Sequence, residues 1–247
     1  MSAQTNNTLR LGLIGAGRIS RAHIKRVNDT QGAVRLTAVA DLDEATAEQR
    51  ASEAGLDTGR VYVDAKRMTR EAPIDAVSIC TTHASHAELA IAAAEAGKHV
   101  LVEKPMANSL DECRAMIAAA DKAGVTLMVN QNQRFSPEHV AAKLLIDAGQ
   151  LGDIRGGTVY WYQNIVRARG DDPKNNWLLD GEATGGGVLI ALGVHQIDTL
   201  RFWLGEIDTV YAVNRICDPH FINNAEDYAF VTLNFTCGAV IQLTNIY

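Results

Sequence analysis

The sequence lacks the features that define several large classes of protein. Its 247 residues include 23 lysines and arginines against 29 aspartates and glutamates, and the net charge is −6. Binders of nucleic acids or anionic membranes need clustered positive charge, so this composition disfavours both. No uncharged apolar run reaches the roughly 18 residues of a membrane span, and no basic segment followed by an apolar one marks a secretory signal at the N-terminus.

Cysteine is scarce, and its spacing matches no metal site. The four cysteines lie far apart, at positions 80, 113, 217 and 237. A reduced, cytoplasmic setting is therefore expected. Apolar residues make up 47% of the chain, which is enough for a sizeable core. The length allows one large domain or two modest ones.

Short apolar runs alternate with helical patterns over the first 130 residues. The runs span residues 11–16, 35–40, 76–80, 99–102 and 126–129. Because they are continuous rather than alternating, they predict strands that are covered on both faces, as in a parallel sheet. The clearest helix is predicted from Ser109 to Ala123, where Ser109 and Glu112 form a capping box. We therefore predict a doubly wound α/β domain over residues 1–130.

The pattern changes after about residue 150. Strands are predicted at residues 158–165, 210–216, 229–235 and 239–246, with one helix at 194–204. Because most of these strands have no helix between them, an antiparallel sheet is the simplest interpretation for a second domain over residues 131–247. The chain ends at Tyr247 inside a predicted strand, which would leave an apolar sheet edge bare. We therefore expect the second domain to be truncated.

A glycine-rich turn joins the first predicted strand to the first helix. Gly15 permits a tight turn, and Gly17 lets the backbone approach a pyrophosphate at the helix N-terminus. Ser20 replaces the third glycine of the usual fingerprint but is still small. Asp41 follows Gly17 by 24 residues, where a carboxylate can bind ribose hydroxyls and repel a 2′-phosphate, so NAD is favoured over NADP. A bare turn, and for Asp41 a helix N-cap, are the structural alternatives.

Three further motifs accompany this turn. They are Cys80-Thr81-Thr82-His83-Ala84-Ser85-His86, Gly97-Lys98-His99-Val100-Leu101-Val102-Glu103-Lys104-Pro105, and the stretch from Gly185-Gly186-Gly187 to His195-Gln196-Ile197-Asp198. Together with the glycine turn, they resemble the Gfo/Idh/MocA family of oxidoreductases. The resemblance implies an α/β Rossmann domain followed by an α+β domain with a large, mostly antiparallel open sheet. In that family the sheet often forms the oligomer interface, and the chains usually continue well past the point where this one ends.

Lys104 is the first candidate catalytic residue. A lysine at the carboxyl end of a parallel strand projects into the ligand crevice, and burial there beside a cationic nicotinamide would lower its pKa. Such a lysine can bind a substrate oxygen and transfer a proton. The resemblance assigns Lys104 to catalysis and Glu103 to the nicotinamide-side ribose. The alternative is a surface lysine paired with Glu103.

His195 is the second candidate. The resemblance implies that it takes the substrate proton and that an aspartate four residues earlier orients it. Ala191 stands at that position and can neither set the imidazole tautomer nor stabilise imidazolium, so we rank Lys104 above His195. A buried histidine satisfied by backbone groups is the alternative. Asp198 also matches the family pattern, and we interpret it as structural.

The resemblance implies further contacts. For the cofactor these involve Arg18, Ile19, Thr81, Thr82, His86, Lys104 and Gln131, and for the substrate they involve Asn132, Trp177, Lys104 and His195. His86 could equally lie on a helix surface. Leu178 stands where relatives often have an arginine, which leaves the polarity of the substrate open. No metal site is predicted.

These observations predict an NAD-dependent oxidoreductase that transfers hydride between the nicotinamide and a secondary alcohol or ketone of a sugar or polyol. A non-catalytic dinucleotide-binding regulator of the same fold is the alternative, motivated by Ala191. Glycosidase-like chemistry through transient oxidation ranks last, because no paired carboxylates are evident. The expected partners are a small-molecule substrate and further copies of the chain, joined through the sheet of the second domain.

Overall fold

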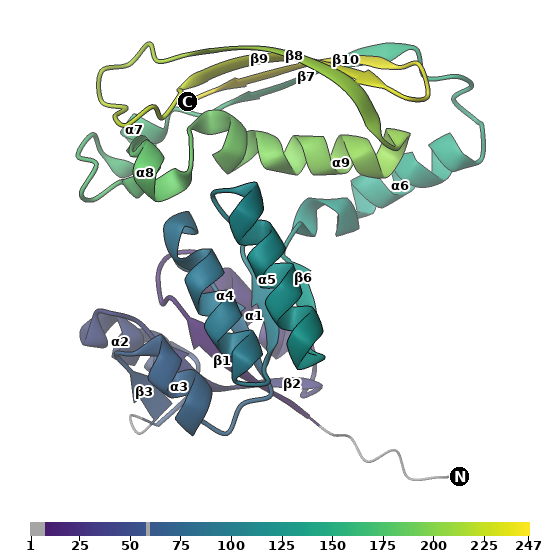
Figure 1. Cartoon of the computed structure of the whole chain (residues 1–247). Helices are drawn as coiled ribbons and strands as arrows, with labels where there is room; N and C mark the ends of the chain where they lie inside the picture. The colour runs from purple at the N-terminus through teal and green to yellow at the C-terminus, as the bar shows by residue number, and fades with distance from the viewer. Residues whose placement is uncertain (1–7, 58–59) are drawn as a thin grey trace, which may run out of the picture. The chain divides into compact units, whose positions relative to one another are not determined.

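The computed structural model of the protein describes residues 8–57 and 60–247. The chain divides into two compact units, residues 1–130 and residues 131–247 (Figure 1). Among the described residues, no helix combines the length and the apolar character needed to cross a membrane.

The first unit is built on a parallel sheet. Within the described part of the chain it has six strands in the order β3-β2-β1-β4-β5-β6. They are β1 (Leu9–Ile14), β2 (Val34–Ala40), β3 (Val61–Tyr62), β4 (Ala76–Ile79), β5 (His99–Val102) and β6 (Leu127–Val129). The strand order reverses between β1 and β4, and doubly wound sheets bind ligands at this point, outside the carboxyl ends of the strands. The doubly wound architecture predicted for the first domain is confirmed.

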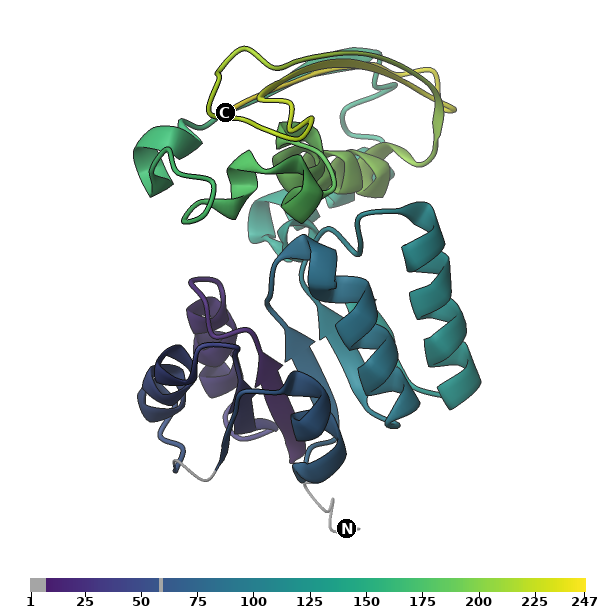
Figure 2. The ribbon, with the colours of Figure 1, turned by 60° about the vertical axis from the view of Figure 1, so that its left-hand side comes forward.

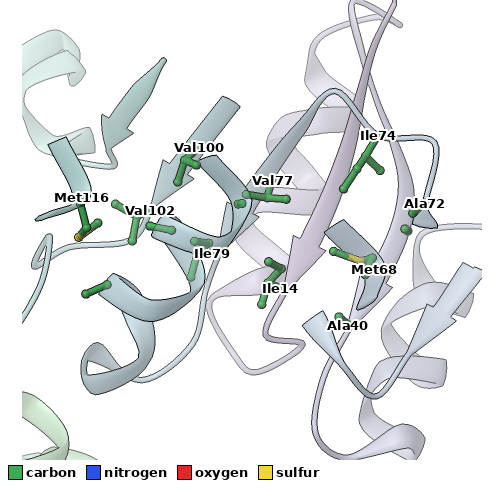
Figure 3. Close-up of a cluster of buried hydrophobic side chains, with 14 of the residues drawn as sticks. Ile14, Ala40, Met68, Ala72, Ile74, Val77, Ile79, Val100, Val102 and Met116 are labelled. Atoms are coloured by element: carbon green, nitrogen blue, oxygen red, sulfur yellow. The ribbon is translucent and has the colours of Figure 1, made fainter. Parts of the chain in front are cut away.

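Helices cover both faces of this sheet (Figure 2). They are α1 (Ser20–Asp29), α2 (Glu44–Glu53), α3 (Ala65–Glu71), α4 (His86–Glu95) and α5 (Leu110–Ala123). The consecutive residues Leu13 and Ile14 point to opposite faces, and both are buried, Leu13 in the cluster with α1 and α2 and Ile14 in the cluster with α3, α4 and α5. Figure 3 shows the second cluster, in which Met68 and Met116 pack against the strands. Burial on both faces explains why the strands appear as continuous apolar runs.

Helix α5 forms as its sequence predicts. The Ser109 side chain accepts a hydrogen bond from the Glu112 N–H, the Glu112 carboxylate accepts one from the Ser109 N–H, and Gly124 ends the helix with φ of 66°. The predicted capping box is therefore confirmed. A left-handed φ of this kind at a helix end favours glycine.

The second unit is a mixed sheet with helices on one face (Figure 1). Its strands are β7 (Gly156–Tyr162), β8 (Ile207–Arg215), β9 (Tyr228–Phe235) and β10 (Val240–Ile246), and its helices are α6 (Pro137–Asp147), α7 (Ile165–Arg169), α8 (Gly181–Thr184) and α9 (Val194–Leu204). Leu200 of α9 packs on Val231, Leu233, Ile241 and Leu243 of the sheet. Strand β9 pairs antiparallel with β8 and β10.

The mostly antiparallel sheet expected for this unit is confirmed, because β7 pairs parallel with β10 while the other pairings are antiparallel. Two predicted details were wrong. The predicted strand 158–165 ends at Tyr162, and Ile165 begins α7 instead, because the Asn164 side chain accepts a hydrogen bond from the Arg167 N–H and so caps that helix. Helix α6, which begins at Pro137, was not predicted.

Candidate functional site

The turn after β1 requires glycine at Gly15 and leaves open space at Gly17. Gly15 has φ of 89°, and a Cβ atom there would lie 2.7 Å from the carbonyl carbon of Cys80. A Cβ atom on Gly17 would have no described heavy atom within 4 Å. Gly15 therefore serves the packing of the turn against β4, whereas Gly17 keeps the backbone accessible to a ligand.

Asp41 and Arg50 hold the peptide groups of this turn from two sides. The Ala16 N–H donates to Asp41 Oδ2 at 2.6 Å, and Arg50 donates to the Ala16 carbonyl oxygen through Nε at 3.0 Å and Nη2 at 2.9 Å. Arg50 is only 4% exposed, so its guanidinium is committed to the turn. The sequence did not single it out, because its contact joins segments 34 residues apart.

The alternative role of Asp41 as a helix N-cap is wrong. Asp43 caps α2, because its side chain accepts hydrogen bonds from the N–H groups of Ala45 and Thr46. Asp41 Oδ1 accepts the Asp43 N–H at 3.0 Å. Asp41 thus directly follows β2 and touches the glycine turn, which is where a ribose-binding carboxylate lies in Rossmann domains.

The predicted neighbours of the turn lie around the same edge of the sheet. Arg18 and Ile19 are exposed between Gly17 and α1, and no side chain caps the start of that helix. Thr81 and Thr82 follow β4 and are half-buried. The Ser85 hydroxyl donates to Thr81 Oγ1 at 2.7 Å and lies 2.9 Å from the Thr82 carbonyl oxygen.

His86 is buried in the first unit and anchors the segment after β5. It is 0% exposed, and its Nδ1 lies 2.8 Å from the Pro105 carbonyl oxygen. Burial lowers the pKa of His86 despite this hydrogen bond and a weaker contact of Nε2 with the Thr81 carbonyl oxygen at 3.4 Å. The neutral imidazole therefore donates its Nδ1–H to the nearer Pro105 carbonyl. The alternative of a helix-surface residue is wrong.

Glu103 is buried at the end of β5 among hydrogen-bond donors. His23 Nε2 lies 2.7 Å from Glu103 Oε1, and Asn130 Nδ2 donates to the same oxygen at 2.6 Å. Glu103 Oε2 accepts the Lys104 N–H at 3.2 Å. Glu103 is 7% exposed, so its carboxylate is buried beneath the surface. Lys104 itself is half-buried and joined to Pro105 by a cis peptide bond.

The charges of this cluster reinforce one another. Burial alone would raise the pKa of Glu103, but hydrogen bonds from His23 and Asn130 and the positive charges of His23 and Lys104 hold it below its ordinary value. Burial would likewise lower the pKa of His23, but its hydrogen bonds with Cys80 and Glu103 hold it above its ordinary value. The opposite shifts favour an imidazolium–carboxylate pair.

In the second unit, His195 lies in the first turn of α9 and is half-buried. A short π-helical segment, Leu189–Gly193, precedes it and carries Ala191. Ala191 is 2% exposed and packs with Ile165, Leu179 and Phe221. Its position is therefore apolar and offers no carboxylate to the imidazole.

The glycine run before His195 is required by packing within its own unit. A Cβ atom on Gly187 would lie 1.9 Å from the Glu226 carbonyl oxygen. Glu226 Oε1 accepts the Leu189 N–H at 2.9 Å. Asp198 pairs with Arg134, whose Nε donates to its Oδ2 at 2.8 Å, in agreement with its interpretation as structural.

The remaining predicted residues also belong to the second unit. Gln131 Nε2 donates to the Val194 carbonyl oxygen at 3.5 Å, and the buried Gln131 Oε1 has no hydrogen-bond partner among the described residues. Asn132 is exposed at the start of a short 3₁₀ turn, and Trp177 is half-buried in another. A buried acceptor of this kind suits a ligand amide.

The residues at the carboxyl edge of the first sheet fit a dinucleotide. The Gly17 backbone borders open space, the start of α1 has no side-chain cap, and the Asp41 carboxylate lies beside the turn. The positive end of a helix dipole favours a phosphate at the helix N-terminus.

Comparisons with known proteins identify the family. Residues 9–131 match the oxidoreductase family with an NAD-binding Rossmann fold, and residues 139–247 match the GFO/IDH/MocA C-terminal domain. The chain is 34% identical to inositol 2-dehydrogenase of Rhizobium meliloti over 227 residues, which cover 92% of this chain and 64% of the relative. It is 29% identical to myo-inositol 2-dehydrogenase of Thermotoga maritima over 240 residues, which cover 96% of this chain and 68% of the relative.

Solved structures show the same fold. An oxidoreductase from Agrobacterium radiobacter, crystallised with NAD+, L-tartaric acid and magnesium, has a TM-score of 0.86 at 26% identity and covers 98% of this chain and 67% of its own. The WlbA dehydrogenase from Bordetella pertussis, crystallised with NADH and UDP-GlcNAcA, has a TM-score of 0.87 at 26% identity and covers 97% of this chain and 71% of its own. The chain spans about two thirds of the length of the curated relatives it matches. The protein belongs to the Gfo/Idh/MocA family of oxidoreductases, and its first unit is the family's NAD-binding Rossmann domain.

Proposed function

We propose that the protein is an NAD-dependent oxidoreductase that acts on a secondary alcohol or ketone of a sugar or polyol. The observation that carries this proposal is the placement of Lys104 two residues after β5, at the same sheet edge as the glycine turn after β1. Relatives named inositol 2-dehydrogenase and 1,5-anhydro-D-fructose reductase support the substrate class.

The dinucleotide would be held by groups of the first unit. The backbone at Gly17 and the start of α1 would bind the pyrophosphate, and Asp41 would bind ribose hydroxyls and repel a 2′-phosphate, which favours NAD over NADP. Arg50 does not offset this preference, because its guanidinium is buried against Ala16. When bound, NAD supplies the ring carbon that accepts or donates the hydride.

Lys104 would bind the substrate oxygen and hold its proton. An ammonium group can donate a hydrogen bond to a carbonyl or alkoxide oxygen, and a neutral amine can accept the proton of an alcohol. His195 is the second candidate for the proton, and Trp177 and Asn132 are candidate substrate contacts. Because alanine stands at position 191, where the resemblance implies an aspartate that orients His195, we place the main acid–base role on Lys104.

The same apolar surroundings of Ala191 favour a second candidate function. If His195 cannot stabilise a positive charge and Lys104 alone is insufficient, the protein would bind NAD without turnover and act as a regulator. Purified protein that binds NAD but shows no turnover would favour this second function.

The outer face of the second sheet is the candidate surface for self-association. Large side chains from several strands are exposed on this unit, including Tyr160, Tyr162, Tyr211, Phe230 and Val240. Exposed large apolar side chains gathered on one sheet face indicate an interaction site. We therefore expect a homo-oligomer, which light scattering of the purified protein would show.

The function is tested by binding followed by turnover. A thermal-shift screen should show a larger stabilisation by NAD than by NADP, since a ligand that binds only the native state raises the melting temperature. A panel of inositols, other polyols and sugars should then change the absorbance at 340 nm with NAD. Binding of NAD with no change across the panel would overturn the enzymatic proposal.

A further inference from the structure

His23 is a buried histidine whose role is not explained by the proposed chemistry. It lies in the first turn of α1, directly after the glycine turn, and its side chain is 9% exposed. Its Nδ1 is 2.8 Å from the Ser78 hydroxyl of β4, and its Nε2 is 2.7 Å from Glu103 Oε1 after β5. One imidazole therefore joins the cofactor-binding helix to the segment that carries Lys104.

The carboxylate that faces this imidazole favours its protonated form. Ser78 of β4 and Cys80 directly after β4 face the ring, Glu103 faces it directly after β5, and Asn130 Nδ2 lies 3.4 Å away after β6. Glu103 is the carboxylate among them, and a buried carboxylate needs a compensating charge or strong donors. The imidazolium supplies both.

The backbone on each side of Lys104 is held by a buried histidine. On one side, Glu103 Oε2 accepts the Lys104 N–H at 3.2 Å, and His23 and Asn130 fix that carboxylate. On the other side, His86 Nδ1 lies 2.8 Å from the Pro105 carbonyl oxygen. The two histidines come from α1 and α4, so the position of Lys104 depends on both helices.

We propose that His23 is a positioning residue that acts through Glu103: its imidazolium neutralises and orients the buried carboxylate, which fixes the backbone and the electrostatic surroundings of Lys104. The role of Lys104 in this inference rests on the proposed function. The charge and geometry of the His23–Glu103 pair do not depend on turnover and can be measured without a substrate.

The first test observes the charge state directly. In the ¹⁵N NMR spectrum of the full chain with labelled histidine, both ring nitrogens of His23 should be protonated at pH 7.5, whereas His86 should be a neutral imidazole with its proton on Nδ1. His23→Gln and His86→Gln spectra assign the signals. A neutral His23 at this pH would overturn the inference, whether or not the protein has activity.

The second test measures the effect on Lys104. His23→Gln keeps a donor but removes the charge, and His23→Phe removes both. His99→Gln is the matched control, because His99 is exposed at the opposite end of β5 and accepts the Thr126 N–H at 3.0 Å. Competitive acylation followed by mass spectrometry gives the pH profile of Lys104 labelling in each variant.

With the imidazolium gone, the negative charge of Glu103 is uncompensated and favours the ammonium form of Lys104. The labelling profile of Lys104 should therefore move to higher pH in His23→Gln and should not move in His99→Gln. With an active substrate, kcat of His23→Gln should fall on the order of 10- to 100-fold, as expected for a displaced reacting group, while the Kd for NAD changes much less. The fall in kcat should be larger for His23→Phe than for His23→Gln, because phenylalanine removes the hydrogen-bond donor as well as the charge.

Unchanged labelling of Lys104 in a folded His23→Gln protein would contradict the inference. Loss of NAD binding without a change in labelling would also contradict it, because that result assigns His23 to the cofactor helix alone. If the wild-type protein shows no turnover but His23 is protonated and controls Lys104 labelling, the proposed function fails and the positioning network stands.

Discussion

Lys104 and His195 lie in surroundings of different character. Near Lys104, the buried Glu103 is hydrogen-bonded to the half-buried side chains of His23 and Asn130, and the three form one connected set at the edge of the parallel sheet. In the segment before His195, Ala191 is buried in an apolar cluster. A polar network in a low-dielectric environment can adjust the charge and orientation of a neighbouring catalytic group. Apolar side chains define only the shape of the space around such a group. This difference supports our proposal that Lys104 in the first unit carries the main acid–base role.

Substitutions of the two candidate catalytic residues should have the largest effects on kcat. Lys104→Met should lower kcat by roughly 10²- to 10⁴-fold, the range for loss of a general acid–base group, with little change in the Kd for NAD. His195→Gln should cost about 10-fold or less, because no carboxylate at residue 191 supports its imidazole. Steady-state kinetics with an active substrate measure both, and a larger loss for His195→Gln would reverse the assignment.

Ala191→Asp tests whether the surroundings of residue 191 in the second unit exclude a carboxylate. A carboxylate introduced among Ile165, Leu179 and Phe221 should lower the free energy of unfolding by about 2–5 kcal/mol. Ala168→Asp, on an exposed face of α7, is the matched control and should change it by about 0.5 kcal/mol or less. Urea unfolding measures both. A stable Ala191→Asp protein with increased turnover would show that His195 can be recruited and would weaken the comparison.

Within the first unit, substitutions of Gly15 and Gly17 should have different effects, because Gly15 is required for packing and we propose that Gly17 is required for ligand contact. Gly15→Ala should destabilise the protein by about 2–4 kcal/mol, because its left-handed φ and its close approach to Cys80 both oppose a side chain. Gly17→Val should leave the melting temperature of the ligand-free protein nearly unchanged but weaken NAD binding on the order of 10-fold or more. Calorimetry measures both. If the Gly17→Val protein binds NAD as tightly as the wild-type protein, the glycine turn does not contact the cofactor.

The smallest effect is the pH dependence of the His23–Glu103 pair. Because folding raises the pKa of His23, its stabilisation is complete below the ordinary pKa of 6.5 and declines as the pH rises above that value. Because folding lowers the pKa of Glu103, its stabilisation is complete above the ordinary pKa of 4.5 and is lost as the pH falls below it. The difference in unfolding free energy between wild-type protein and His23→Gln should therefore be largest near pH 5–6 and smaller at either extreme. A difference independent of pH would contradict the ion pair.

Local patterns were sufficient to predict most elements of the fold. The strand at His99–Val102 and the helix at Val194–Leu204 have the predicted bounds, because each is specified by contiguous apolar periodicity. The parallel pairing of β7 with β10 was not predictable in this way, since it depends on contacts between segments far apart in the sequence.

The candidate site shows the same division. Gly15 and Gly17 were identified because turn chemistry is local. Arg50 and His23 were missed because their partners, Ala16 and Glu103, lie 34 and 80 residues away. The sequence did show a histidine one helical turn after the glycine fingerprint. The role of His23 could be inferred only once the structure placed the buried Glu103 carboxylate beside it.

A crystal structure of the full chain with NAD would give the distance from Lys104 Nζ to C4 of the nicotinamide, on which the proposed role of Lys104 depends. We predict that this distance is within about 6 Å, which is one reacting-atom separation plus one hydrogen bond. A Lys104 ammonium that points into solvent, away from the nicotinamide, would contradict it.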